Sequence, residues 1–226
     1  MTDIFREALG HFLDVHDFEN VSFLPTSGGV NNVVFYVKID SEINHVLRIY
    51  NNGNDDSKVV FEHSILAQLS LHSFSFKLPQ TIPSLHDGKA FVRLSSGASA
   101  CLFKLIPGVL PKLTNVEAIG RVSGELNRAM YKIDRHQLPL VSPNPPYYDL
   151  YKVHHAIKRD LFFSKINSED LDIWRSEADF IIQEITEIEG KIGMYLANPS
   201  ILPINLIHGD LHYDNILCDG GVVTGE

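Results

Sequence analysis

The stretch L-I-H-G-D-L-H-Y-D-N-I-L, residues 206–217, decides the fold expected for this chain. Two short apolar runs, residues 206–207 and 216–217, flank a polar segment, a pattern that predicts a strand, an exposed loop and a second strand. The loop carries Asp210 and, five residues later, Asn215. A carboxylate can act as a base, and an amide oxygen is a neutral ligand for a hard cation. The alternative is a plain polar hairpin loop with Gly and Asn at its turns.

The loop H-G-D-L-H-Y-D-N, residues 208–215, resembles the catalytic loop of the aminoglycoside phosphotransferase and choline kinase superfamily, whose members phosphorylate small molecules on the protein-kinase fold. Protein kinases share the spacing from Asp to Asn but carry Arg at the position of Gly209. The resemblance implies that Asp210 accepts the proton of the hydroxyl being phosphorylated and that Asn215 binds magnesium. It also implies ATP and Mg²⁺ as cofactors and a small-molecule hydroxyl as the acceptor.

The beginning of the chain predicts a helix and three strands, in the order that opens a kinase N-lobe. Apolar residues at helical spacing indicate a helix over residues 4–13, and strands follow over residues 21–24, 33–39 and 45–50. A turn with the adjacent Gly28 and Gly29 separates the first two strands, and such a pair lets backbone N–H groups approach phosphates. Most Gly-Gly pairs, however, are plain hairpin turns. The resemblance implies that Gly28, Gly29 and Asn31 contact the nucleotide.

A possible ion pair follows in the next two elements. The strand Val-Leu-Arg-Ile, residues 46–49, has the context of the kinase segment Val-Ala-Ile-Lys, with Arg48 at the position of the phosphate-pairing Lys. An Arg fork also grips phosphate oxygens and a carboxylate. A helix over residues 59–69 carries Glu62, which the resemblance implies is the partner of Arg48. A surface Arg and an exposed helical Glu are the alternative.

The rest of the chain predicts a hinge and a mainly helical second lobe. Residues 90–94 and 100–106 indicate paired strands, and the second ends at Ile106, Pro107 and Gly108. The resemblance implies a hinge whose backbone at Ile106 binds adenine. We therefore expect an α+β, bilobal protein-kinase-like fold, with an N-lobe of antiparallel sheet plus helix over residues 1–106, a hinge over 107–112 and a C-lobe over 113–226.

Three helices are expected in the C-lobe. A capping box from Thr114 to Glu117 predicts the start of the first, and apolar periodicity predicts others over residues 151–163 and 170–196. In the resembling kinases the strand after the catalytic loop continues to an Asp that holds the principal magnesium ion. Here that strand begins at Val222 and the sequence stops at Glu226, so we expect a truncated chain with impaired catalysis. We also expect uncovered apolar faces on the 170–196 helix and on Val222 and Val223, which a dimer or another partner would cover.

Composition excludes some function classes. A net charge of -9 without any basic run argues against a nucleic-acid partner, and no apolar run approaches membrane-spanning length. Cys101 and Cys218 lie in apolar runs, which predicts free thiols in a reducing compartment, the cytoplasm.

Within the superfamily, the turn over residues 27–32 and the segment C-L-F-K-L-I-P-G, residues 101–108, are most similar to homoserine kinases of the aminoglycoside-phosphotransferase type. Choline, methylthioribose and aminoglycoside kinases remain alternatives. Two other functions stay open: a pseudokinase that serves as a nucleotide-binding or interaction module, and a metal-dependent hydrolase using His208, Asp210 and His212. Alternate residues of one loop rarely converge on one ion without distant ligands, so the hydrolase is the weakest of the three hypotheses.

Overall fold

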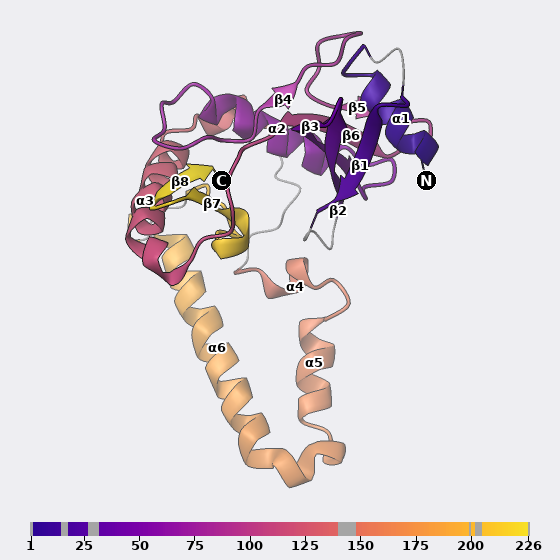
Figure 1. Ribbon diagram of the computed structural model, residues 1–226. Coiled ribbons are helices and arrows are strands. Elements are labelled where there is room, and N and C mark those ends of the chain that lie inside the picture. Colours follow the sequence, from indigo (N-terminus) through magenta and orange to yellow (C-terminus); the bar gives the residue numbers. More distant parts are fainter. Residues whose placement is uncertain are drawn as a thin grey trace. The chain divides into compact units, whose positions relative to one another are not determined.

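The computed structural model describes residues 2–14, 18–26, 32–139, 148–198, 200–201 and 205–225. The chain forms two compact units (Figure 1): one comprises Met1–Val141 together with Leu206–Glu226, and the other comprises Ser142–Asn205. The division into an N-lobe, a hinge and a C-lobe stays a prediction.

An antiparallel sheet forms the N-terminal part of the first unit, as the sequence predicts. Its strands pair in the order β1-β2-β3-β6-β4, and β5 also pairs with β6. The strands and the helices around them are α1 (Thr2–Gly10), β1 (Val21–Pro25), β2 (Asn32–Ile39), β3 (Glu42–Tyr50), α2 (Ser57–Leu69), β4 (Thr81–Ile82), β5 (Val92–Arg93) and β6 (Ser99–Lys104). A tight turn at Asp40 and Ser41, both with positive φ, joins β2 to β3 and matches the twist of the strands.

Strand alternation gives each face of the sheet its own helix. Leu47 and Ile49 of β3 pack with α1, whereas Val46 and Tyr50 pack with Val59 of α2. Successive side chains of a strand point to opposite faces, so Arg48 lies on the α2 side together with Val46 and Tyr50. The same alternation in β6 sends Leu102 toward α1 and Cys101 toward α2.

A helix and a short hairpin form the remainder of the first unit. Helix α3 (Val116–Tyr131) packs against the hairpin of β7 (Leu217–Asp219) and β8 (Val222–Gly225). Their shared core contains the buried side chains of Val122, Leu126, Met130, Ile216, Cys218 and Val223. The predicted capping box is wrong, because Thr114 lies inside a 3-10 turn, Leu113–Asn115, that precedes the helix. The side chain of Asn115 accepts a hydrogen bond from the backbone N–H of Lys112 instead (2.8 Å).

Backbone hydrogen bonds join two segments, one after β6 and one before β4, to this hairpin. Val109 and Cys218 exchange two N–H to C=O bonds of 2.9 and 2.8 Å, and Lys77 N–H donates to Thr224 O (2.9 Å). The approach requires Gly108, whose φ is +154°: a Cβ there would lie 2.6 Å from Thr224 Oγ1.

We expect Gly108→Ala to destabilise the protein by about 1–3 kcal/mol, because the new methyl group combines an unfavourable φ with a steric overlap. Urea unfolding of the variant measures this loss. Gly221→Ala is the matched control, since a Cβ at Gly221 meets no atom within 4 Å. Equal stability of the two variants would contradict the close approach of Gly108 to the hairpin.

The second unit is helical, with boundaries that differ from those predicted. It contains α4 (Leu150–Val153), α5 (Arg159–Ile166), a 3-10 turn (Glu169–Trp174) and α6 (Arg175–Ala197). The prediction of one helix over residues 151–163 is wrong. Tyr151 and Arg159 both bind Glu189 of α6, at 3.0 and 2.8 Å, and the chain is extended at Lys158 between the two short helices. The helix predicted from residue 170 begins at Arg175, whose side chain donates to the carbonyl of Ser168 (2.9 Å) and so stabilises the preceding turn.

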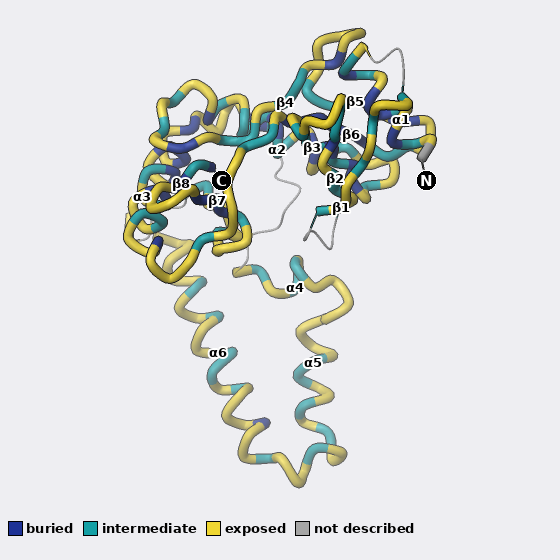
Figure 2. The backbone as a smooth tube through the Cα atoms, viewed as in Figure 1, coloured by how far each residue is buried: buried dark blue, intermediate teal, exposed yellow. Residues whose placement is uncertain are grey.

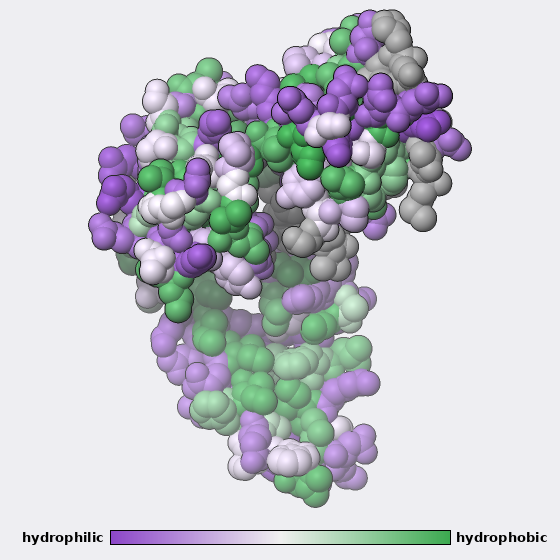
Figure 3. All heavy atoms as spheres, in the orientation of Figure 1, coloured by the Kyte–Doolittle hydropathy of each residue, from purple (hydrophilic) through white to green (hydrophobic). Residues whose placement is uncertain are grey.

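Apolar side chains are exposed along α6, as expected from the sequence. Ala178 alone is buried among the α6 residues, all of which are described, and Phe180, Ile181 and Ile188 are exposed. Figure 2 shows α5 and α6 almost wholly in the exposed and intermediate colours, and Figure 3 shows apolar atoms gathered over the same part of the view. The expectation for the last strand is only half right. Val222 is 63% exposed, but Val223 is 3% exposed because alternation turns it toward α3. In the described part of the chain, no helix is long and apolar enough to cross a membrane.

Candidate active site

The structure brings Arg48 and Glu62 together. Arg48 Nη1 on β3 lies 2.7 Å from Glu62 Oε1 on α2, and the two side chains are 31% and 36% exposed. Burial by itself lowers the pKa of Arg48, but the charge of Glu62 together with the contributions of Tyr50 and Cys101 outweighs it, and the net shift of the pKa is upward. The guanidinium therefore stays charged at every physiological pH. Binding of nucleotide phosphates by this pair stays a prediction.

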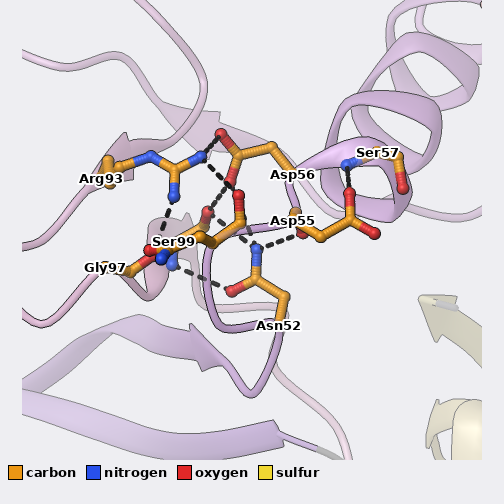
Figure 4. Close-up of polar contacts among 8 residues, drawn as sticks. Asn52, Asp55, Asp56, Ser57, Arg93, Gly97 and Ser99 are labelled. Atoms are coloured by element: carbon orange, nitrogen blue, oxygen red, sulfur yellow. Dashed lines mark hydrogen bonds and ion pairs between the residues drawn. The ribbon is translucent and has the colours of Figure 1, made fainter.

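A polar network that the sequence did not indicate fixes the loop between β3 and α2 (Figure 4). Asn52 Oδ1 accepts the backbone N–H of Ser99 (3.1 Å), and the Ser99 hydroxyl donates to Asp56 Oδ1 (2.5 Å). Arg93 forms an ion pair with Asp56 and donates to Gly97 O (3.1 Å). Because Asp56 immediately precedes α2, the network anchors the N-terminus of the helix that carries Glu62.

The catalytic-loop candidate has an irregular backbone. Gly209 has a φ of +82°, a conformation that costs other residues about 1–2 kcal/mol. The strand predicted at residues 206–207 is wrong: no strand forms there, and Ile207 is 59% exposed. Strand β7 pairs with β8 on one side and with Val109 on the other, so neither of its edges is free to pair with these residues.

Hydrogen bonds within the loop bring Asp210 and Asn215 together. Asn215 Nδ2 donates to Asp210 O (2.7 Å) and to Asp210 Oδ2 (3.2 Å). Because the amide nitrogen is bound to Asp210, the amide oxygen points away from that residue and can serve a cation. The next residue, Ile216, is 1% exposed and anchors the loop in the α3 core.

Two histidines brace the same loop. His208 Nδ1 accepts the backbone N–H of Asp210, and His212 Nδ1 accepts that of Asp214, both at 3.3 Å. His212 Nε2 lies 3.5 Å from Asp210 Oδ1. Burial lowers the pKa of His208, an effect that outweighs the opposing charge of Asp210, so the ring is neutral at neutral pH. The side chain of Asp210 itself is 74% exposed and accessible to a substrate.

The hinge candidate offers a free backbone edge. Leu105 N–H donates to Asn44 O, and Val109 N–H donates to Cys218 O, both at 2.9 Å. Between them, no residue that the structure describes bonds to the backbone N–H or C=O of Ile106. A free donor and acceptor on adjacent chain atoms can pair with the edge of a purine ring. Adenine binding at Ile106 stays a prediction, as do the roles of Gly28, Gly29 and Asn31, which lie outside the described residues.

The donor atoms of the loop fit a hard cation better than zinc. The amide oxygen of Asn215 and nearby carboxylates are oxygen ligands of the kind that Mg²⁺ takes. Across the described ranges, no three His, Cys, Asp or Glu side chains converge as metal ligands. His208, Asp210 and His212 therefore do not form a ligand set, and the hydrolase hypothesis gains no support.

Stability should depend on pH through His63, which is buried, and His45, which is partly buried. Burial lowers the pKa of His45 and of His63 from the usual value of about 6.5. Below that value the unfolded chain binds protons that the native rings do not, so the free energy of unfolding falls with falling pH until the native pKa values are reached. We expect a lower Tm at about pH 5.5 than at about pH 7.5, and a smaller difference in His63→Phe. A Tm that is flat across this window would contradict the prediction.

Comparison with solved structures shows the same fold. A microcompartment-associated aminopropanol kinase is 19% identical with a TM-score of 0.70, over 99% of this chain and 68% of that one. An amicoumacin kinase in complex with AMP-PNP, Ca²⁺ and Ami is 15% identical with a TM-score of 0.58, over 96% and 60%. An ADP-bound aminoglycoside phosphotransferase, APH(2'')-Ib, is 15% identical with a TM-score of 0.54, over 99% and 68%. The chain thus spans 60 to 68% of the lengths of these solved chains.

No curated protein matches the chain. The family model described as "Phosphotransferase enzyme family" matches residues 22–225, a range that includes β1 to β6 and the loop with Asp210 and Asn215. The chain belongs to this family of phosphotransferases.

Proposed function

We propose that this protein is an ATP- and Mg²⁺-dependent kinase that phosphorylates a hydroxyl group of a small molecule. The observation that carries the proposal is the Asp210–Asn215 arrangement, in which one exposed carboxylate and one amide oxygen are held on a braced loop. Family membership supports the reaction class, and solved relatives of the same fold contain AMP-PNP with Ca²⁺ or ADP.

In the proposed reaction each polar group has one task. Asp210 accepts the proton of the acceptor hydroxyl, which needs only a weak base because the transition state of phosphoryl transfer is loose. Arg48, held by Glu62, binds phosphate oxygens of ATP, and the free backbone edge of Ile106 binds adenine. Asn215 supplies an oxygen to Mg²⁺, which when bound neutralises charge on the phosphates.

We infer that the acceptor is an amino alcohol of the homoserine type. One structure of the same fold is an aminopropanol kinase, and its named substrate class, like homoserine, combines a hydroxyl with an amine that is cationic at neutral pH. The net charge of -9 and the exposed Asp214, whose carboxylate lies 3.6 Å from the same His212 ring that Asp210 approaches, favour an acceptor that carries a cationic amine. Both cysteines are free and buried, which suits a cytoplasmic enzyme.

The test is a coupled assay of ADP release with Mg²⁺-ATP and a panel of homoserine, 1-amino-2-propanol, choline, methylthioribose and an aminoglycoside. ADP release that depends on an amino alcohol, with a phosphorylated product seen by mass spectrometry, is the expected result. Turnover with another panel member would keep the kinase and overturn the acceptor. Binding of AMP-PNP in calorimetry without turnover on any acceptor would favour the nucleotide-binding module, and absence of nucleotide binding would overturn the whole proposal.

A further inference from the structure

Glu62 reaches Arg48 only while α2 keeps its place over the sheet. The ion pair itself contributes little to that placement, because pairs that are about one-third exposed stabilise a structure by roughly 0–1 kcal/mol. The network around Asp56 holds only the N-terminus of the helix. Packing of Val59 against Tyr50 also holds α2 on the sheet, but apolar packing has no direction, so a directional contact is needed to fix the turn of α2 on which Glu62 lies.

That contact is a buried polar group at His63, the residue next to Glu62. The Tyr50 hydroxyl shares a hydrogen bond of 3.3 Å with His63 Nε2, and the Cys101 thiol donates to the Tyr50 oxygen (3.6 Å). The imidazole stacks on Phe91 and on Phe103, with ring centroids 5.6 and 6.1 Å apart. His63 is thus held by two aromatic rings and one directional bond, which together define the rotation of α2 as well as its distance from the sheet.

Two of the aromatic rings around His63, those of Tyr50 and Phe103, also contact Arg48. Its guanidinium carbon lies 5.7 Å from the centroid of Tyr50 and 5.2 Å from that of Phe103. Cation–π contacts at this range stabilise a partly desolvated guanidinium by about 0.5–2 kcal/mol. Tyr50 and Phe103 therefore contact both Arg48 and His63. A shift of either ring would displace Arg48 directly and Glu62 through its neighbour His63.

We propose that His63 and Tyr50 are positioning residues, which set the geometry of the Arg48–Glu62 pair through their buried hydrogen bond. The link to phosphate binding rests on the proposed function, whereas the coupling between these four side chains does not. If the two residues only filled the core, their substitution would lower stability without changing how Arg48 and Glu62 interact.

A mutant cycle on stability separates these possibilities without any need for catalysis. Arg48→Gln, Glu62→Gln and their double variant are unfolded in urea, first in the native background and then with Tyr50→Phe or His63→Phe. Both background changes keep an aromatic ring and remove the hydrogen bond. Ser64→Ala, on the same helix, is the control background, because among the described residues the Ser64 hydroxyl bonds only to the carbonyl of Val60 in its own helix.

We expect a coupling between Arg48 and Glu62 of about two- to fivefold in the unfolding equilibrium constant in the native and Ser64→Ala backgrounds. This coupling should disappear with Tyr50→Phe and with His63→Phe. Retention of the full coupling in the Tyr50→Phe background would overturn the proposal, even if His63→Phe failed to fold.

Nucleotide affinity provides the second readout, measured by calorimetry with AMP-PNP on the whole protein. Tyr50→Phe should weaken binding about three- to tenfold in the native background and change it little in the Arg48→Gln background, because both substitutions remove the same interaction. Additive losses would overturn the proposal. If the native protein binds no AMP-PNP, the proposed function fails, and the urea cycle still decides the coupling.

Discussion

Substitution of Asp210 with Asn is expected to lower kcat by about 10²- to 10⁴-fold and to leave the protein folded. The amide cannot accept the proton of the acceptor hydroxyl, yet it preserves the size of the side chain and an oxygen that accepts from Asn215. Steady-state kinetics at saturating Mg²⁺-ATP and acceptor, together with a Tm, give the measurement.

Asp219→Asn is the matched control for this prediction, since Asp219 is an exposed carboxylate at the end of β7, the strand that follows the loop. It should keep full turnover, because it removes the same charge without touching the loop. An Asp210→Asn variant that retained a tenth or more of the native kcat would contradict the role of base.

The second large effect is expected for Asn215→Ala. The quantity that should change is the Mg²⁺ concentration that gives half-maximal activity. This concentration should rise about 10- to 100-fold, because the substitution removes an oxygen ligand and also the hydrogen bonds that orient Asp210. Activity is measured as a function of Mg²⁺ at fixed ATP, and Asn127→Ala on the exposed face of α3 serves as the control.

The two loop variants should differ in how excess metal affects them. High Mg²⁺ should restore a large part of the activity of Asn215→Ala, whereas Asp210→Asn should remain impaired at every concentration. A native Mg²⁺ profile for Asn215→Ala would remove Asn215 from the metal site.

The sheet was predictable because it follows from short-range patterns, whereas the meeting of Arg48 with Glu62 was implied by the family resemblance. Alternating residues in β2 and β3 define the faces of the sheet, and the helix that carries Glu62 directly follows β3. In contrast, the contacts of Asn52 with Ser99 and of Tyr50 with Cys101 join residues that are 47 and 51 positions apart in the sequence. Single polar residues carry no periodic signal, so a sequence cannot indicate which distant partner completes their hydrogen bonds.

The catalytic loop shows the same limit in another form. Its polar residues were recognisable from type and spacing, but the apolar pair at residues 206–207 was read as a strand. An apolar pair fits a strand only if a partner edge is available, and here both edges of β7 are occupied by β8 and Val109. Whether an edge is free is a property of the assembled fold, so local pattern could not decide it. In the same way, α4 and α5 separate because both bind Glu189 on a later helix.

The backbone hydrogen bonds from Val109 and Lys77 to the β7–β8 hairpin bear on the length of the proposed site. Val109 follows Ile106 by three residues and Cys218 follows Asn215 by three residues, so the two bonds between Val109 and Cys218 hold the two proposed binding segments together. In the proposed site, the separation of these two segments is the distance that a nucleotide would span between Ile106 and Asp210.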